Sequence, residues 1–382
     1  MTVCKKCLVS SRDSGVELDG EGLCRLCRSA RSGSRPAPPP ELVDRCLRDF
    51  EETVAGVRGR FAYDGLICLS GGKDSSYLAF LLREKYGLKL LGFNLRTGFE
   101  APGAGANLER VIRKLGIELD RFVWPADFSR RFYRYFFGRP LREGLTATVC
   151  RACQLALLGA AVQAARRRSI PLVFVGYSPF QTAEKWFYEI EKATLDAHYR
   201  AFDGFWEQPG LSPGFKKNFY PLGDEAAGGE GGSFPRVLIP LHVCGCPSEK
   251  RVREKLAELG LLAAKKTLPR RTKCRLVWLS AYLDTVHFDD YPFRELVSEK
   301  IRVGEASRRR YLAAGAIFTW LCRHRLFRKR LIRKTLAELG LDEAEALACL
   351  GKARKSDRGY RDIFRIRPDR EILPGPEGEA RP

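Results

Sequence analysis

The stretch Leu66-Ile-Cys-Leu-Ser-Gly-Gly-Lys-Asp-Ser75 decides the fold of this chain. Its first four residues are all apolar, which is typical of a strand buried inside a parallel sheet. The next six residues combine two glycines with hydroxyl, ammonium and carboxylate side chains, and we predict that a helix begins at Ser75 or Ser76. A strand, a glycine turn and a helix N-terminus together form a cradle for an anion such as phosphate.

Each side chain of this loop suits phosphate chemistry. Gly71 and Gly72 let the backbone approach phosphate oxygens, and Ser70 and Ser75 can donate hydroxyl hydrogen bonds. Lys73 would neutralise phosphate charge during a reaction, and Asp74 suits a ligand of Mg²⁺. The glycines stand too close together for a Walker loop. We predict Lys73, Asp74 and Ser70 as the catalytic residues.

Short apolar strands alternate with helices from Tyr63 onward. After Leu66–Leu69, the expected strands cover residues 88–94, 122–124, 171–176 and 237–242. The expected helices cover residues 41–60, 76–86, 106–114, 154–167 and 248–260. Repeated strand–helix units of this length predict an α/β fold with a doubly wound parallel sheet, which binds ligands at the carboxyl ends of its strands.

The Ser-Gly-Gly-Lys-Asp-Ser run at 70–75 resembles the signature of the PP-loop ATP pyrophosphatase superfamily (adenine nucleotide alpha hydrolase-like), over roughly residues 60–290. The resemblance implies a Rossmann-type domain that uses ATP and Mg²⁺, adenylates a carbonyl-type oxygen and releases pyrophosphate. A nitrogen or sulfur nucleophile then displaces AMP. By position, residues 70–75 would hold the pyrophosphate end of ATP, Phe93 and Asn94 would lie near the adenosine, and Gly176 would form a second turn near the nucleotide.

Two C-x-x-C pairs lie near the N-terminus with 16 residues between them: Cys4, Cys7, Cys24 and Cys27. Four thiolates at this spacing suit a tetrahedral Zn²⁺ site, and so short a module needs the ion in order to fold. The alternative is a redox or catalytic role. Residues 15–24 and 107–116 also resemble the N-acetyl sugar amidotransferase family. That resemblance implies a sugar-like substrate and ammonia from a partner glutaminase subunit.

A third C-x-x-C pair is formed by Cys150 and Cys153, just before the helix expected at 154–167. The tRNA-thiolating branch of the PP-loop enzymes has a similar pair. The resemblance implies Cys274 as a third ligand of a [4Fe-4S] cluster, with Cys244 and Cys246 as competitors, and a sulfur donor as partner. A second metal, a redox pair and a purely structural role are the alternatives.

The chain has 382 residues and a net charge of +21, from 67 Lys and Arg against 46 Asp and Glu. Residues 300–334 hold 12 of the basic side chains and only one acid, Glu305. Such a segment indicates either contact with a nucleic acid such as tRNA, or a solvated basic face or site for a small anion.

We divide the chain into a zinc-ribbon-like module (1–30), a linker and helix (31–60), a PP-loop domain (61–290), a helical basic region (291–371) and a tail (372–382). No run of about 18 apolar residues and no apolar leader is present, so we expect a cytoplasmic protein without a membrane span. Thirteen cysteines in such a protein indicate thiols and metal ligands rather than disulfides. A homodimer is one expected assembly.

The sequence therefore favours an ATP-dependent enzyme that replaces an oxygen with nitrogen, similar to the N-acetyl sugar amidotransferases. The alternative is a sulfur transferase with an Fe–S cluster that acts on tRNA or a small metabolite. A third alternative is a non-catalytic RNA-binding protein that has kept the loop.

Overall fold

The computed structural model describes residues 2–10, 16–31, 39–141, 144–179, 188–200, 203–209, 211, 234–262, 274–289 and 291–351. The predicted tail (372–382) and most of the predicted linker after residue 31 lie outside these ranges.

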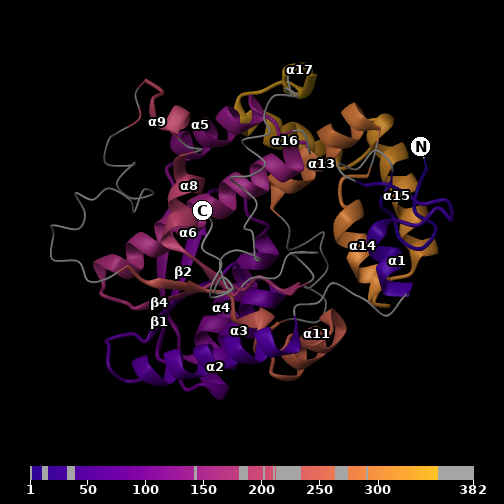
Figure 1. Cartoon of the computed structure of the whole chain (residues 1–382). Coiled ribbons are helices and arrows are strands. Elements are labelled where there is room, and N and C mark those ends of the chain that lie inside the picture. Colours follow the sequence, from indigo (N-terminus) through magenta and orange to yellow (C-terminus); the bar gives the residue numbers. More distant parts are fainter. Residues whose placement is uncertain are drawn as a thin grey trace, which may run out of the picture.

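A six-stranded sheet forms the centre of the molecule (Figure 1). Its strands are β1 (Gly65–Cys68), β2 (Leu90–Arg96), β3 (Glu118–Val123), β4 (Leu172–Phe174), β5 (Glu189–Ile190) and β6 (Arg236–Leu238). Their order across the sheet is β3-β2-β1-β4-β6-β5, and every neighbouring pair is parallel except β5 with β6. The predicted α/β fold is confirmed, and the antiparallel edge strand β5 is an addition that the sequence analysis did not anticipate.

Helices cover both faces of the sheet, as a doubly wound fold requires. One face carries α2 (Pro40–Val57), α3 (Lys73–Phe80), α4 (Pro102–Leu115) and α11 (Glu249–Glu258), and the other carries α5 (Ala126–Phe137), α6 (Leu145–Arg167) and α13 (Arg275–Phe288). Alternate residues of β1 enter the two cores: Leu66 and Cys68 pack on the α6 side, and Ile67 packs on the α3 side. Both cores are closed to solvent, so the strands are apolar on both faces.

The connections leave β1 and β4 in opposite directions across the sheet. From β1 the chain runs through α3 to β2 and then through α4 to β3 on one side, whereas β4 pairs with the other side of β1. The carboxyl ends of β1 and β4 are therefore the point where the strand order reverses, which is where open α/β sheets bind ligands.

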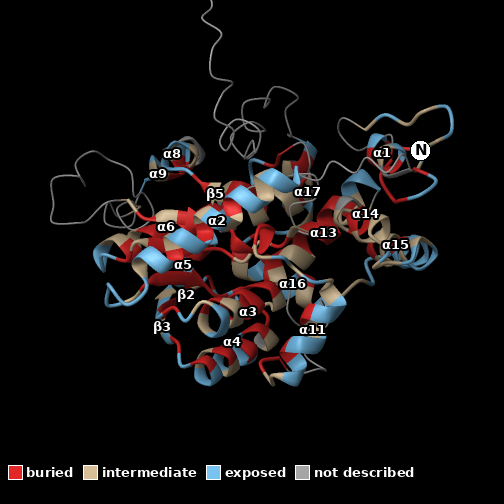
Figure 2. Ribbon diagram, turned by 60° about the horizontal axis from the view of Figure 1, so that its bottom comes forward, coloured by how far each residue is buried: buried red, intermediate tan, exposed pale blue. Residues whose placement is uncertain are grey.

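The C-terminal part is helical, as predicted. Four helices follow α13: α14 (Arg294–Arg302), α15 (Arg308–Arg323), α16 (Lys329–Leu339) and α17 (Glu343–Gly351). The last three pack against α13. The N-terminal module, with α1 (Arg25–Arg31), lies beside α14 and α15 at one end of the molecule (Figures 1 and 2). The N-terminal module therefore lies beside helices from the C-terminal part of the sequence.

The remaining elements are short. They are a π-helical turn at Leu81–Lys85 that extends α3, a 3₁₀ turn at Pro240–His242, and the helices α8 (Lys192–Arg200) and α9 (Asp203–Trp206).

Helix α6 begins nine residues earlier than predicted, at Leu145 instead of residue 154. Cys150 and Cys153 therefore lie inside the helix, not before it. The cause is a cap from a distant element. The carboxylate of Asp284 on α13 accepts hydrogen bonds from the backbone N–H groups of Leu145 (2.7 Å) and Thr146 (2.8 Å). Helix α3 likewise begins at Lys73, two residues before the predicted start.

Helix α6 is long and apolar enough, by length and composition, to cross a membrane, which the sequence analysis did not anticipate. In this fold 61% of its 18-residue apolar window is buried inside the protein. It packs against the sheet and α13, as the core helix of a soluble protein does.

Candidate functional site

The loop Ser70–Ser75 lies directly after β1, with a backbone that depends on glycine. Gly71 has a φ of +71°, and a Cβ atom there would lie 2.0 Å from the carbonyl oxygen of Ala104. The loop therefore tolerates no side chain at this position. The hydroxyl oxygens of Ser70 and Ser75 lie 3.2 Å apart, so both hydroxyls gather on the loop.

The two charged side chains of the loop contact each other. The ammonium of Lys73 donates to the carboxylate of Asp74 at 2.7 Å, and their side chains are only 17% and 10% exposed. A site that is to hold phosphates and a divalent cation thus keeps both required charges in place and mutually neutralised. Binding of such ligands would separate the pair, because the phosphate attracts Lys73 and the cation attracts Asp74.

A second turn closes on the loop from β4. A Cβ atom on Gly176 would lie 2.8 Å from the Cα of Ser75, so the two backbones touch. Asn94, at the end of β2, donates its amide to the carbonyl of Leu69 at 2.6 Å and ties the third strand end to the loop. Phe93 is 2% exposed and packs in the core on the α6 side. A contact of Phe93 or Asn94 with adenosine stays a prediction.

One functional candidate was missed in the sequence. Glu249, the first residue of α11, brings its carboxylate to 4.0 Å from the ammonium of Lys73 and 2.5 Å from that of Lys300. The N-cap of α11 is Ser248, which begins the helix predicted at 248–260 and whose hydroxyl accepts a hydrogen bond from the backbone N–H of Arg251. Nothing local in the sequence distinguishes Glu249 from an ordinary acid in a first helical turn.

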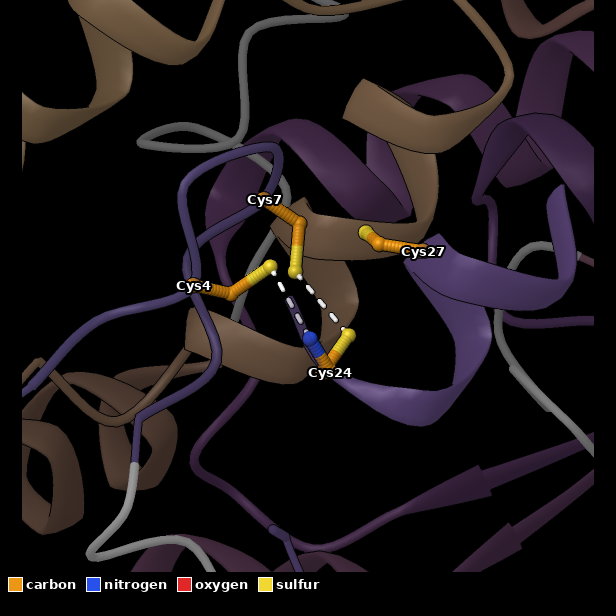
Figure 3. Close-up of side chains that lie close together, drawn as sticks. All are labelled: Cys4, Cys7, Cys24 and Cys27. Carbon is orange, nitrogen blue, oxygen red and sulfur yellow. Dashed lines mark hydrogen bonds between the residues drawn. The ribbon is translucent and has the colours of Figure 1, made fainter. Parts of the chain in front are cut away.

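The four N-terminal cysteines converge with their sulfurs toward one another (Figure 3). Among the described residues they form the one group of at least three His, Cys, Asp or Glu side chains whose ligand atoms all lie within 4.8 Å of one another. All four are buried. Four clustered thiols fit a structural Zn²⁺ ion in ligand type, number and spacing, although a cluster of iron is also bound by thiolates.

We call residues 2–10 and 16–31 the knuckle. It is held against α14 and α15 by specific bonds. The guanidinium of Arg308 donates to the carbonyls of Cys7 (3.0 Å) and Cys4 (2.9 Å), and the hydroxyl of Ser298 accepts from the N–H of Leu8 at 2.9 Å. Arg302 lies 3.8 Å from the sulfur of Cys7. A hydrogen bond from Cys27 and, less strongly, the charge of Arg302 lower the pKa of Cys7 to about 4, against the effect of burial.

The three cysteines predicted to hold an iron–sulfur cluster are brought together only in part. Asp284 on α13 bonds to the start of α6, and α13 packs against α6. Cys153 on α6 lies near Cys274, the residue before α13, and both pack in the core on the α6 side. Burial and, less strongly, the neighbouring Cys274 raise the pKa of Cys153 to about 12, against the effect of a hydrogen bond with Tyr133. Cys150 stands one turn before Cys153.

The two competing cysteines lie elsewhere. Cys244 and Cys246 pack on the opposite, α3 side of the sheet, where the hydroxyl of Tyr86 lies 3.5 Å from the sulfur of Cys244. Burial and the charge of Asp74 raise the pKa of Cys246 to about 12. Of the three candidates for a third ligand, Cys274 is the one on the same side as Cys153.

No protein-family model and no curated protein matches this chain. Several solved structures are similar to it. NMN synthetase from Francisella tularensis has 14% identity and a TM-score of 0.34, over 77% of this chain and 96% of that one. The U34-tRNA thiolase NcsA from Methanococcus maripaludis, solved with its [4Fe-4S] cluster, has 16% identity and a TM-score of 0.30, over 82% and 89%.

The NH3-dependent NAD synthetase from Campylobacter jejuni has 11% identity and a TM-score of 0.29. The match covers 37% of this chain and 58% of the synthetase. TM-scores and identities this low carry no conclusion about the function of this chain.

Proposed function

We propose that this chain is an ATP-dependent enzyme that releases pyrophosphate, adenylates a carbonyl-type oxygen of its substrate and then exchanges AMP for a nucleophile. The observation that carries the proposal is the loop Ser70–Ser75 at the carboxyl end of β1, with the Lys73–Asp74 pair beside the Gly176 turn. Glycine is required at both positions where the backbones come closest, which leaves the loop's hydroxyl and ammonium groups for the ligand.

In the first step the substrate oxygen attacks the α-phosphorus of ATP, and the bond from that phosphorus to pyrophosphate breaks. Lys73 and the hydroxyls of Ser70 and Ser75 would stabilise the charge that collects on the pyrophosphate. Asp74 would hold Mg²⁺, which when bound offsets phosphate charge. In the second step the nucleophile attacks the activated carbon, and AMP leaves with the former substrate oxygen.

The experiment is to incubate the protein with Mg²⁺, ATP and a substrate panel whose carbonyl oxygen carries ¹⁸O. We expect AMP and pyrophosphate in equal amounts, with the label in the phosphate of AMP. Lys73→Ala and Asp74→Ala should abolish AMP formation while the fold, followed by circular dichroism, persists. Full activity in the Asp74→Ala enzyme, or unlabelled AMP, would contradict the assignment.

For the nucleophile we propose sulfur, because Cys153 lies near both Cys274 and Tyr177, the residue that follows Gly176. The buried Tyr177, next to Gly176, has its pKa raised by burial and further by the neighbouring Cys68 and Cys153. Cys150, Cys153 and Cys274 would hold a [4Fe-4S] cluster, which when bound offers an iron site able to take up sulfide. A sulfur-donating partner would then be required.

Nitrogen is the second candidate, favoured by the four-thiol knuckle, since the N-acetyl sugar amidotransferases carry a similar N-terminal module. The substrate would be sugar-like and a glutaminase subunit would supply ammonia. Metal and acid-labile sulfide analysis of protein purified without oxygen separates the two. Zinc together with iron and sulfide supports sulfur as the nucleophile. The iron and sulfide should then be lost in Cys153→Ser and Cys274→Ser but kept in Cys349→Ser. Zinc alone, with unaltered AMP formation in both variants, supports nitrogen.

A tRNA substrate is part of the sulfur proposal, and the basic segment 300–334 bears on it. At least six of its 12 cations make contacts within the protein. Five of them form ion pairs, namely Lys300, Arg302, Arg323, Arg325 and Lys334, and Arg308 holds the knuckle. On α15, Arg309 and Arg310 are exposed, and we propose that they face an anionic partner. Binding of bulk tRNA that weakens steeply with salt would support this substrate, and no binding at low salt would exclude it.

A further inference from the structure

Four charged side chains stand in a row of alternating sign at the phosphate loop. Lys300 contacts Glu249 at 2.5 Å, Glu249 lies 4.0 Å from Lys73, and Lys73 contacts Asp74 at 2.7 Å. The four side chains are 10–22% exposed, so solvent screens them poorly. The row extends from α14 through α11 to the start of α3.

Glu249 is built to stay ionised. Burial raises its pKa, but Lys73, Lys300 and Arg253 outweigh this effect and lower the pKa to about 2. Its backbone N–H donates to the carboxylate of Glu305 at 3.1 Å, which fixes the start of α11. Glu249 is thus a permanent negative charge at a fixed place, 4.0 Å from the ammonium of Lys73.

We propose that Glu249 is a positioning residue for Lys73, and that Lys300 sets the strength of its pull. The inference rests on the proposed function, because it assigns Lys73 to the phosphates of ATP. When Mg²⁺ engages Asp74, Lys73 loses its close partner, and Glu249 keeps the ammonium at the loop. Lys300 and Arg253, which both contact Glu249, neutralise most of its charge, so that Lys73 is held near the carboxylate without being drawn into direct contact.

The two single changes should displace Lys73 in opposite directions. Glu249→Gln leaves Lys300 facing Lys73 without an acid between them and pushes Lys73 onto Asp74. Lys300→Met frees the Oε2 oxygen of Glu249, which lies 4.0 Å from Lys73, while Arg253 keeps the Oε1 oxygen; the freed oxygen should draw Lys73 away from Asp74. Either displacement should weaken binding of the Mg²⁺ complex of an ATP analogue with a non-cleavable α,β-methylene bridge. We expect a weakening of roughly tenfold, which corresponds to about 1.4 kcal/mol.

The charge reversal Glu249→Lys with Lys300→Glu is the decisive variant. It restores an ion pair between α11 and α14, but it puts an ammonium next to Lys73 instead of a carboxylate. A merely structural pair would recover both melting temperature and analogue affinity. We expect the melting temperature to recover and the affinity to stay low. Glu254→Gln is the matched control, because its exposed i,i+4 pair with Lys250 lies on the same helix.

Calorimetric titration of each purified full-length variant with the analogue gives the result. Wild-type affinity in Glu249→Gln, or recovered affinity in the reversed pair, would overturn the inference while leaving the proposed function intact. Failure of the wild-type protein to bind the analogue would instead overturn the proposed function.

Discussion

Replacement of Asp284 by alanine should destabilise the start of α6, the helix that carries Cys150 and Cys153. The Asp284 carboxylate is 2% exposed and accepts from two backbone N–H groups, at 2.7 and 2.8 Å. Each buried N–H left without an acceptor costs about 1–3 kcal/mol, so the variant loses roughly 2–6 kcal/mol from this cause. The loss in free energy of unfolding caused by this variant also depends on pH.

Burial raises the pKa of Asp284 from 3.8 to about 6, and its hydrogen bonds reduce the shift without cancelling it. The folded protein therefore binds this proton more tightly than the unfolded chain. The group's contribution to stability is full below pH 3.8 and is lost as the pH rises through 6. Between pH 7.5 and pH 5 the wild-type protein should gain about 1.4 kcal/mol that the alanine variant lacks.

The assay is urea unfolding, followed by tryptophan fluorescence, of wild-type protein, Asp284→Ala and Asp284→Asn at pH 7.5 and pH 5. The free-energy deficit of the alanine variant should be larger at pH 5. The asparagine variant keeps one acceptor oxygen and should fall between the other two. A deficit that is equal at both values, or smaller at pH 5, would refute the buried, raised-pKa carboxylate as the cap of α6.

Three further outcomes are expected. Removal of the knuckle's metal by a chelator should make residues 2–31 sensitive to protease while the sheet keeps its circular dichroism, since such a module depends on its ion; a protease-resistant apo knuckle would show that packing alone holds it. Arg308→Met should release the knuckle from α15 while the metal is retained, because each lost charged hydrogen bond costs about 1.5–3 kcal/mol. The exposed Arg309→Met should leave the knuckle in place. Limited proteolysis and metal analysis of the two variants test this difference. Gly71→Ala should abolish binding of the ATP analogue, because its Cβ would meet the carbonyl of Ala104, and Gly105→Ala, with open space around it, should bind normally; equal affinities in the two variants would show that the loop has another conformation.

Much of the fold, and the loop at 70–75, could be predicted from local sequence patterns. The apolar run at Leu66 and the glycines at 71 and 72 act over a few residues, so their structure follows from nearest neighbours. The convergence of the four cysteines in the knuckle was also predictable, because two C-x-x-C pairs with short spacing are typical of a metal site. The helix at 248–260 was found through Ser248, a cap whose hydrogen bond is local.

The missed features are those set by distant partners. The start of α6 depends on Asp284, which is 139 residues away from Leu145. The partner of Lys73, Glu249, is set by the packing of α11 on α3, and its own partner Lys300 comes from a third helix. The two-residue strand β5 has too short a pattern to read and exists only because β6 offers it an edge. Pairing across such distances is not encoded in periodicity.

The docking of the knuckle has a consequence for how the chain is made. Leu8 bonds to Ser298, 290 residues later, so the ribosome finishes the knuckle long before its seat on α14 and α15 exists. At about 5–20 residues per second, the delay is roughly 15–60 s. During that time a bound metal ion would have to keep the knuckle folded without help from α14 and α15. Docking on α14 and α15 then joins segments that are far apart in the sequence, so a molecule truncated before α14 would carry a knuckle without its docking surface.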